Sequence, residues 1–167
     1  MKGNINICSI NCQGLGDHTK RRDVFRYIKN KGFDMFLLQD THFEKKNENL
    51  IRSEWGYECW FNSYTSRSRG VSILFNNTFE FKNVVIRSDD SGNFLIMKIE
   101  VDSISYVIAN IYAPNRENPN FFRNIQTVIN SFGENNIIIG GDWNCLLDAE
   151  NMLPKFVRIL SFGFTMT

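Results

Sequence analysis

Two polar side chains in the C-terminal part of the chain stand where they could act together on a phosphate. The apolar run Asn136-Ile137-Ile138-Ile139 leads into Gly140-Gly141-Asp142-Trp143-Asn144. The run predicts a buried strand, and the two glycines predict a tight turn that ends it. Residues two apart in an extended segment point the same way, so Asp142 and Asn144 are expected to face one pocket, with Trp143 turned to the other side. A carboxylate and a carboxamide that converge on one point suit a phosphate, its attacking water or a hard metal ion.

The same segment has a plainer interpretation as a turn. Asp and Asn side chains hydrogen-bond their own backbone, so Gly-Asp-x-Asn is also a good turn sequence. Four other segments, taken in chain order, favour the functional interpretation. They are a strand at residues 4–10 followed by Asn11-Cys12-Gln13-Gly14-Leu15, then Phe36-Leu37-Leu38-Gln39-Asp40-Thr41-His42, Gly70-Val71-Ser72-Ile73-Leu74-Phe75, and Ala109-Asn110-Ile111-Tyr112-Ala113-Pro114-Asn115.

Together with the Gly-Gly-Asp-Trp-Asn segment, this series resembles the endonuclease/exonuclease/phosphatase superfamily. Within that superfamily the chain resembles the endonuclease domains of LINE-type (non-LTR) retrotransposon proteins, which are relatives of exonuclease III and the apurinic-site endonucleases. The resemblance covers about residues 4 to 148. It implies a phosphodiester hydrolase that acts on DNA and uses Mg²⁺ or Mn²⁺, with no organic cofactor.

The resemblance assigns the metal-binding acid to Asp40 and its neighbouring amide to Asn11. The commonest family pattern has Glu where this chain has Asp40, and Asp is one methylene shorter. The charge is kept, so we expect the metal to shift or to take an additional water molecule. Mg²⁺ keeps several waters, so one or two protein ligands are enough. Asp40 also fits a strand-end turn without a metal.

The resemblance places the remaining site residues on the second half of the series. Asp142 corresponds to the acid that orients the attacking water or protonates the leaving oxygen, and Asn144 to the amide that holds a phosphate oxygen. Tyr112 corresponds to the phenol that donates to the scissile phosphate, with Asn115 contacting phosphate beside it. Tyr112 could instead be an ordinary strand-end aromatic residue. His42 is a secondary candidate, because its position in a strand would put it on the same face as Asp40.

One family motif has no counterpart in these 167 residues. The family closes its site with a Ser-Asp-His segment, whereas the two histidines here are His18 and His42, both early in the chain. Loss of such a general base or electrophilic group typically costs ~10² to 10⁴ in rate. We expect residues 1–148 to form a partial domain, residues 149–167 to be a non-matching tail, and the chain to be truncated.

Composition sets further limits. A chain of 167 residues with net charge +1 and 43% hydrophobic residues predicts one folded domain. Candidate phosphate contacts are the basic patches Lys20-Arg21-Arg22, Lys45-Lys46 and Arg67-Ser68-Arg69, each of which also fits a solvated surface. Without a signal peptide or a long apolar stretch, we expect an intracellular protein, nuclear or cytoplasmic, with no membrane partner. The cysteines Cys8, Cys12, Cys59 and Cys145 are expected to be reduced thiols, and a zinc site from Cys8, Cys12 and His18 is a remote alternative.

Periodicity and turn residues predict the elements. Helices are expected at residues 19–31, weakly at 47–52, and from Pro119, with Asn118 as N-cap, to Gly133. Strands are expected at residues 4–10, 35–39, 57–61, 71–75, 79–87, 94–101, 105–112 and 137–139. The apolar stripe of the last helix is expected to be core, and consists of Phe121, Phe122, Ile125, Val128, Ile129 and Phe132.

These elements predict an α/β fold, the first half of a four-layer α/β/β/α sandwich. We expect one mixed sheet with helices on one face, and an uncovered inner apolar face that favours association or poor folding. Three functions are compatible with this: an Mg²⁺-dependent DNA endonuclease domain derived from a retrotransposon, a phosphatase of the same superfamily, and an inactive remnant without turnover. The Tyr112-Ala113-Pro114-Asn115 and Gln39-Asp40-Thr41-His42 segments favour the nuclease.

Overall fold

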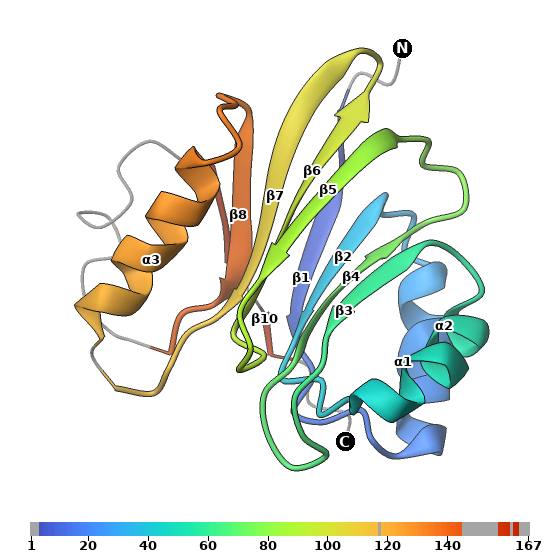
Figure 1. Cartoon of the computed structure of the whole chain (residues 1–167). Helices are drawn as coiled ribbons and strands as arrows, with labels where there is room; N and C mark the ends of the chain where they lie inside the picture. Colours follow the sequence, from blue (N-terminus) through green and yellow to red (C-terminus); the bar gives the residue numbers. More distant parts are fainter. Residues whose placement is uncertain (1–3, 117, 145–156, 161, 164–167) are drawn as a thin grey trace.

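The computed structural model describes residues 4–116, 118–144, 157–160 and 162–163. These residues form four layers in the order helix, sheet, sheet, helix (Figure 1). Helices α1 (His18–Lys29) and α2 (Glu48–Trp55) cover the outer face of the first sheet. Helix α3 (Pro119–Asn130) covers the outer face of the second sheet.

The first sheet has the strand order β10-β1-β2-β4-β3. Strands β1 and β2 are parallel, and β4 is antiparallel to both of its neighbours. A short 3₁₀ helix, Lys45–Asn47, precedes α2. The strands are β1 (Ile7–Asn11), β2 (Met35–Gln39), β3 (Cys59–Asn62), β4 (Val71–Phe75) and β10 (Phe162–Gly163).

The second sheet has the strand order β5-β6-β7-β8-β9. Strands β5, β6 and β7 form an antiparallel meander, whereas β8 is parallel to both β7 and β9. A parallel pair requires a crossover connection, and α3 provides it between β7 and β8. The strands are β5 (Lys82–Ser88), β6 (Phe94–Val101), β7 (Ile104–Tyr112), β8 (Ile137–Asp142) and β9 (Val157–Leu160).

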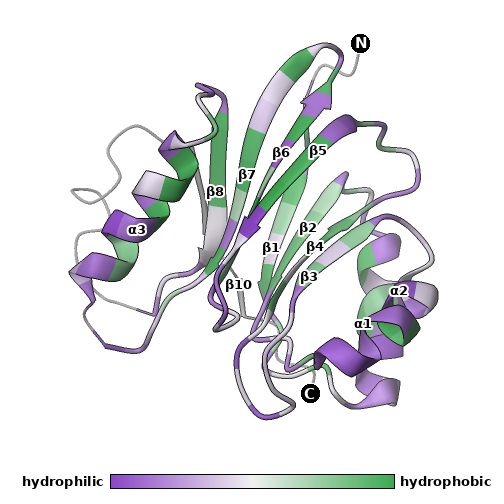
Figure 2. Ribbon diagram, in the orientation of Figure 1, coloured by the Kyte–Doolittle hydropathy of each residue, from purple (hydrophilic) through white to green (hydrophobic). Residues whose placement is uncertain are grey.

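The hydrophobic core has three parts: one between the first sheet and its helices, one between the two sheets, and one between the second sheet and α3. Strand β2 contributes to the first two. All five of its residues are buried, with Phe36 and Leu38 packed under α1 and α2, and Met35 and Leu37 packed between the sheets. A strand in a central layer is covered on both faces, so it is apolar at every position rather than at alternate ones. The third part lies between the second sheet and α3, where Ile125 and Ile129 are fully buried. The resulting division into apolar inner and polar outer surfaces is visible along α3 (Figure 2).

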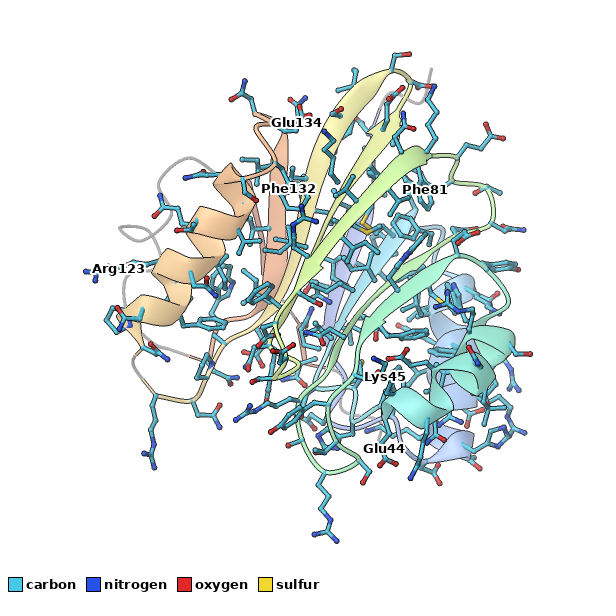
Figure 3. The ribbon with its side chains drawn as sticks, viewed as in Figure 1. Glu44, Lys45, Phe81, Arg123, Phe132 and Glu134 are labelled. Atoms are coloured by element: carbon cyan, nitrogen blue, oxygen red, sulfur yellow. The ribbon has the colours of Figure 1, made fainter. Side chains whose placement is uncertain are left out.

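The predicted elements agree closely with the structure. Asn118 caps α3 by accepting a hydrogen bond from the backbone N–H of Phe121, and the predicted apolar stripe of this helix packs on the second sheet. Phe132 points from the end of α3 towards that sheet, while Arg123 points away from it (Figure 3). The helical piece expected at residues 47–52 extends to Trp55, because Gly56 supplies the left-handed conformation that ends the helix.

Two expectations need correction. The α/β class and the four-layer architecture are confirmed, and each sheet carries its helices on one face. However, the strands are divided between two sheets rather than forming one, and the inner apolar faces cover each other. Periodicity identifies the faces of a strand but not the sheet to which it belongs. The turn expected at Gly140 and Gly141 is also wrong, because both residues lie inside β8 and pair with β7.

The expected boundary at residue 148, the segment 149–156 and Cys145 lie outside the described residues. Of the expected tail, residues 157–160 pair with β8 and residues 162–163 pair with β1, so this segment adds a strand to each sheet. Among the described residues, Cys8, Cys12 and Cys59 are free thiols. None of the described helices combines the length and hydropathy that crossing a membrane requires.

Candidate active site

The two sheets present their strand ends at the same rim. In the first sheet Asn11 pairs with Gln39, and Asp40 follows directly. In the second sheet Tyr112 pairs with Asp142 at the ends of β7 and β8. The carboxyl ends of adjacent parallel strands lie at one edge of a sheet, where α/β folds commonly bind ligands.

Side-chain contacts join the two sheets at this rim. The Asn11 amide donates a hydrogen bond to the Asp142 carboxylate, although the two residues are 131 positions apart. The Tyr112 phenol lies close enough to Asp40 and to Asn144 for both side chains to change its pKa. The structure therefore brings Asn11, Asp40, Tyr112, Asp142 and Asn144 together, which makes the rim a contiguous polar cluster.

The segment after β8 has the orientation that its spacing predicts. The Asn144 backbone N–H donates to Asp142 Oδ1 at 3.0 Å, and the Asn144 side chain donates to the Ala113 carbonyl at 2.8 Å. Trp143 turns to the other side and stacks on Phe122 of α3, with 6.1 Å between ring centroids. Both the turn and the site interpretation are therefore compatible with this segment, because the same carboxylate that holds the turn also reaches Asn11.

Several site residues have a left-handed backbone. The φ angle is +48° at Gln13, +51° at Asp40, +57° at His42 and +45° at Asn144. This conformation costs roughly 1–3 kcal/mol for a residue other than glycine, and such residues are concentrated at functional sites. The contact between Asp40 and His42 therefore arises from a tight loop and not from the alternation of an extended strand.

The Asp40 carboxylate has a defined set of neighbours. Its Oδ1 lies 2.9 Å from His42 Nε2 and accepts a hydrogen bond of 3.1 Å from the backbone N–H of Arg69. Tyr112 is its third neighbour, close enough for the charge of Asp40 to raise the pKa of the phenol. An ionised carboxylate offers about four acceptor sites, so three neighbours leave capacity for a cation.

The donor chemistry of the rim fits a hard divalent cation held by few protein ligands. Asp40 offers a carboxylate. The side-chain oxygen of Asn11, Oδ1, accepts one hydrogen bond, from the backbone N–H of Gln13 at 3.1 Å. The described part of the chain has no group of three His, Cys, Asp or Glu residues that could hold a metal. Oxygen ligands and a low ligand count suit Mg²⁺ or Mn²⁺ better than zinc.

The Tyr112 phenol is set up as a hydrogen-bond donor. Burial raises its pKa, the negative charge of Asp40 raises it further, and the hydrogen bond with Asn144 opposes the change. The raised pKa keeps the hydroxyl proton in place at neutral and mildly alkaline pH. Tyr112 can therefore donate to a phosphate oxygen under those conditions.

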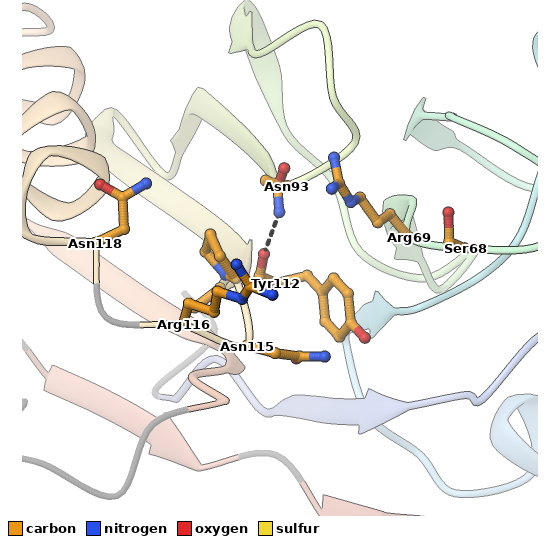
Figure 4. Close-up of a pocket in the computed structure, with 9 residues that line it drawn as sticks. Ser68, Arg69, Asn93, Tyr112, Asn115, Arg116 and Asn118 are labelled. Atoms are coloured by element: carbon orange, nitrogen blue, oxygen red, sulfur yellow. Dashed lines mark hydrogen bonds between the residues drawn. The ribbon is translucent and has the colours of Figure 1, made fainter.

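A pocket of about 550 Å³ adjoins this cluster on the side of Tyr112 (Figure 4). Asn115 lines the pocket and is exposed, whereas Asn11, Asp40 and Asp142 lie outside its lining. The backbone carbonyl of Tyr112 accepts a hydrogen bond of 2.8 Å from the Asn93 amide, which forms part of the wall. Asn115 thus lines the same pocket as Tyr112, which belongs to the polar cluster.

The sequence did not place two groups in the site that shape it, although it offered Arg69 as part of a basic patch. Gln39 and Asn110 are fully buried and joined by a hydrogen bond of 2.7 Å between the sheets. Arg69 and Asn93 reach the pocket from loops that are distant in sequence. A buried amide within an apolar strand could have signalled the first group, because unpaired burial of an amide is costly. No local pattern signals Asn93 or the place of Arg69 beside Asp40, because both depend on how loops meet.

The basic patches differ in their availability. Arg21 is buried against Glu54, with Nε to Oε2 at 2.6 Å, and Lys20 donates to the carbonyl oxygens of Cys12 and Gln13. Lys46 pairs with Glu44 before α2, in the segment labelled in Figure 3. In the patch at residues 67–69, Arg69 lines the pocket. Of the three patches, this last one therefore lies beside the polar cluster in the described structure.

Comparison with known proteins identifies the family. Residues 4–154 match the model of the Endonuclease/Exonuclease/phosphatase family. The chain belongs to this family. A Xenopus laevis relative, the transposon TX1 uncharacterized 149 kDa protein, is 28% identical over 155 residues, which are 90% of this chain and 12% of the relative. The chain thus spans a small part of the length of that curated protein.

Solved structures of the family share the fold. The endonuclease domain of TRAS1, a telomere-specific non-LTR retrotransposon, superposes with a TM-score of 0.65 at 13% identity, covering 89% of this chain and 70% of that domain. The 3′ phosphatase NExo from Neisseria, bound to a product DNA hairpin, gives a TM-score of 0.63 at 14% identity, covering 87% of this chain and 60% of the enzyme. At these identities the structural likeness establishes the fold alone. The expected resemblance to the superfamily is confirmed by the family match, and the chain is similar in sequence to a transposon protein.

Proposed function

We propose that this chain is a retrotransposon-derived endonuclease domain that hydrolyses phosphodiester bonds of DNA with the help of Mg²⁺ or Mn²⁺. The single observation that carries the proposal is the meeting of Asp40 with Tyr112, and of Asn11 with Asp142, across the two sheets. The chain belongs to a family of phosphodiesterases and nucleases, and the similar structures include an endonuclease domain. Residues 1–148 would be the catalytic part and residues 149–167 an appended segment.

In this proposal Asn11 and Asp40 hold the metal ion. When bound, the ion neutralises charge on the phosphate and polarises it towards attack. The backbone N–H of Arg69 and the ring of His42 fix the Asp40 carboxylate from the other side. Asp40 is therefore oriented before substrate arrives.

The second sheet supplies the groups that act on the substrate. Asp142, held by the Asn11 amide, orients the attacking water or returns a proton to the leaving oxygen. Tyr112 donates its phenolic hydrogen to the scissile phosphate, and Asn144 and Asn115 hold phosphate oxygens. Donors that are already aimed at the developing charge lower the barrier without reorganisation.

These 167 residues by themselves should cut DNA slowly. The Ser-Asp-His segment of the family has no counterpart in the sequence, so one general-base or electrophilic group is missing. We expect a rate at least ~10²-fold below that of a complete relative, and rescue when a second half carrying the segment is supplied.

Nicking of supercoiled plasmid DNA tests the proposal. With Mg²⁺ we expect slow, metal-dependent nicking that Asp142→Asn removes, whereas Asp90→Asn, at an exposed position in the β5–β6 turn, leaves it unchanged. Hydrolysis of a soluble phosphate ester without nicking would identify a phosphatase instead. No turnover even with the second half present would identify an inactive remnant.

A further inference from the structure

Lys20 is directed at the backbone of the loop that follows β1. It belongs to a basic patch that the sequence offers for phosphate contact, yet its ammonium group donates to the carbonyl oxygens of Cys12 and Gln13, at 2.9 and 3.0 Å. The Lys20 side chain is half-buried. An ammonium group carries three donors, so two of the three are already committed to this loop.

The position of Lys20 in α1 explains how it reaches the loop. Asp17 is the N-cap of α1, and its carboxylate accepts a hydrogen bond of 2.7 Å from the backbone N–H of Lys20, which places Lys20 in the first turn. Side chains in a helix point back towards its N-terminus, which here means over the preceding loop. The helix dipole opposes a cation in the first turn. Helix stability therefore does not explain a lysine at this position, whereas the loop carbonyls do.

Arg21 holds the second half of the same loop. Its Nη1 atom donates to the carbonyl oxygens of Leu15 and Gly16, at 2.9 and 3.0 Å. The two cations thus bind four backbone carbonyls of the loop. The loop needs this restraint because Gln13, with a φ angle of +48°, is left-handed, a conformation that a residue other than glycine keeps only when its surroundings enforce it.

Gln13 in turn fixes the side chain of Asn11. The backbone N–H of Gln13 donates to Asn11 Oδ1 at 3.1 Å, and the Asn11 amide nitrogen donates to the Asp142 carboxylate. The carbonyl of the same Gln13 is one of the two partners of Lys20. A chain of two contacts therefore joins the Lys20 ammonium group to the Asn11 side chain.

The loop also contacts the segment that contains Asp40. The backbone N–H of Gly14 donates to the Asp40 carbonyl at 2.8 Å, and the backbone N–H of Leu15 donates to the Thr41 carbonyl at 2.8 Å. The loop that Lys20 holds is therefore bonded to both residues proposed as metal ligands.

We propose that Lys20 is a positioning residue of the active site, which keeps the Asn11 amide oriented towards Asp142 and the metal ion by holding the carbonyls of Cys12 and Gln13. The part of this inference that concerns the metal rests on the proposed function, whereas the orientation of the amide does not. A direct phosphate contact by Lys20 is the alternative that the experiment must separate.

Nuclear magnetic resonance of the metal-free protein tests the orientation of the amide. The side-chain amide resonances of Asn11 are assigned by their absence in Asn11→Ala. Lys20→Met removes the ammonium group at similar side-chain length, and we expect the Asn11 resonances to shift. Lys20→Arg again offers donors to both carbonyls and should return them towards their wild-type positions. The matched control is Lys46→Met, because the Lys46 ammonium group pairs with Glu44 at an exposed position.

The affinity for Mn²⁺ is the second measurement. Loss of a group that orients a metal ligand typically lowers metal affinity about 10- to 100-fold. We therefore expect Lys20→Met to bind Mn²⁺ about tenfold more weakly or worse, Lys20→Arg to recover, and Lys46→Met to match the wild type in calorimetric titrations. Circular dichroism confirms that each variant folds, and Lys20→Gln takes the place of Lys20→Met if the latter does not.

The outcomes separate this inference from the proposed function. Shifted Asn11 resonances and weaker Mn²⁺ binding in Lys20→Met, both recovered in Lys20→Arg, support the positioning role. If Lys20→Met lowers only the unfolding temperature, with Asn11 resonances and Mn²⁺ affinity equal to those of Lys46→Met, the inference is overturned, because a structural residue or a phosphate contact would behave in this way. A wild-type protein without Mn²⁺ affinity would count against the proposed function, while the Asn11 resonances would still decide the role of Lys20.

Discussion

At the scale of single residues, Asp40 contacts residues from both sheets and from the loops around it. Its carboxylate contacts His42, the Arg69 backbone and Tyr112, while its backbone carbonyl accepts from the Gly14 N–H at 2.8 Å. So many contacts hold the residue in a left-handed conformation that it would otherwise avoid. The carboxylate is thereby fixed beside the phenol, so the two groups of the proposed site are held in place before substrate binds.

Asp40→Ala should weaken Mn²⁺ affinity by at least about tenfold, because a hard cation loses a charged oxygen ligand. The change can be measured by calorimetric titration or by the spin resonance of free Mn²⁺. Asp90→Ala removes the same charge from an exposed turn and should leave the affinity unchanged. Equal affinity of wild type and Asp40→Ala would remove Asp40 from the metal site.

At the scale of elements, Gly141 decides how closely β8 approaches β7. A Cβ atom built on Gly141 would lie 2.0 Å from the Ile111 carbonyl oxygen, and the φ angle is +149°. We expect Gly141→Ala to cost about 3 kcal/mol or more in unfolding free energy, since a clash between backbones cannot be relieved by a rotamer change. Gly133→Ala meets only open space at a φ of +68° and should cost about 1 kcal/mol. Urea unfolding of both variants checks the difference, and a larger loss for Gly133→Ala would contradict it.

The contact between α1 and α2 should depend on pH. Arg21 donates two hydrogen bonds to the Glu54 carboxylate, at 2.6 and 3.0 Å, and this holds the pKa of Glu54 below its ordinary value. A lowered folded-state pKa stabilises the protein above the ordinary Glu pKa and loses that effect as pH falls through the lowered value. Glu54→Gln should therefore cost about 1–3 kcal/mol at pH 7 and progressively less below about pH 4. Thermal unfolding across this range would argue against the ion pair if the cost stayed constant with pH.

At the scale of the whole molecule, a buried polar bridge aligns the two sheets. Asn110 of β7 accepts from Gln39 Nε2 and donates to the carbonyl oxygens of Leu38 and Ser72, at 2.7 to 2.9 Å. Because Asn11 and Asp40 belong to one sheet and the remaining site residues to the other, this bridge maintains the geometry of the site.

Asn110→Ala should lower the unfolding free energy by about 1.5–4.5 kcal/mol, because it removes three buried hydrogen bonds that each contribute about 0.5–1.5 kcal/mol. Asn136→Ala is a suitable control, since its amide donates to the Ser105 carbonyl at an exposed position and its loss should cost less than about 1 kcal/mol. Denaturant midpoints that shift equally in the two variants would show that the bridge is not stabilising.

Much of the local structure was predictable from the residues. The boundaries of β2, β4 and β6 agree with prediction, and Asn118 caps its helix as expected, because these features depend on neighbours in sequence. The positions of the candidate site residues at strand ends were predictable for the same reason, whereas their meeting at one rim depends on how the two sheets pack. Arg69 was predicted only as part of a basic patch, since its place beside Asp40 depends on a loop meeting another loop.

What the sequence by itself determined is therefore most of the elements before residue 145, their buried faces and the polar residues at their ends, because periodicity and turn chemistry act over a few residues. Strands β9 and β10 were not among them, since residues 149–167 were expected to be a non-matching tail. The tertiary structure alone decided that the strands form two sheets, that Asn11 reaches Asp142, and that Gly141 serves strand approach instead of a turn. Each of these depends on which apolar faces pack together. Alternation specifies that a face is buried but leaves open what covers it, so the contacts between sheets emerge only when the chain is folded.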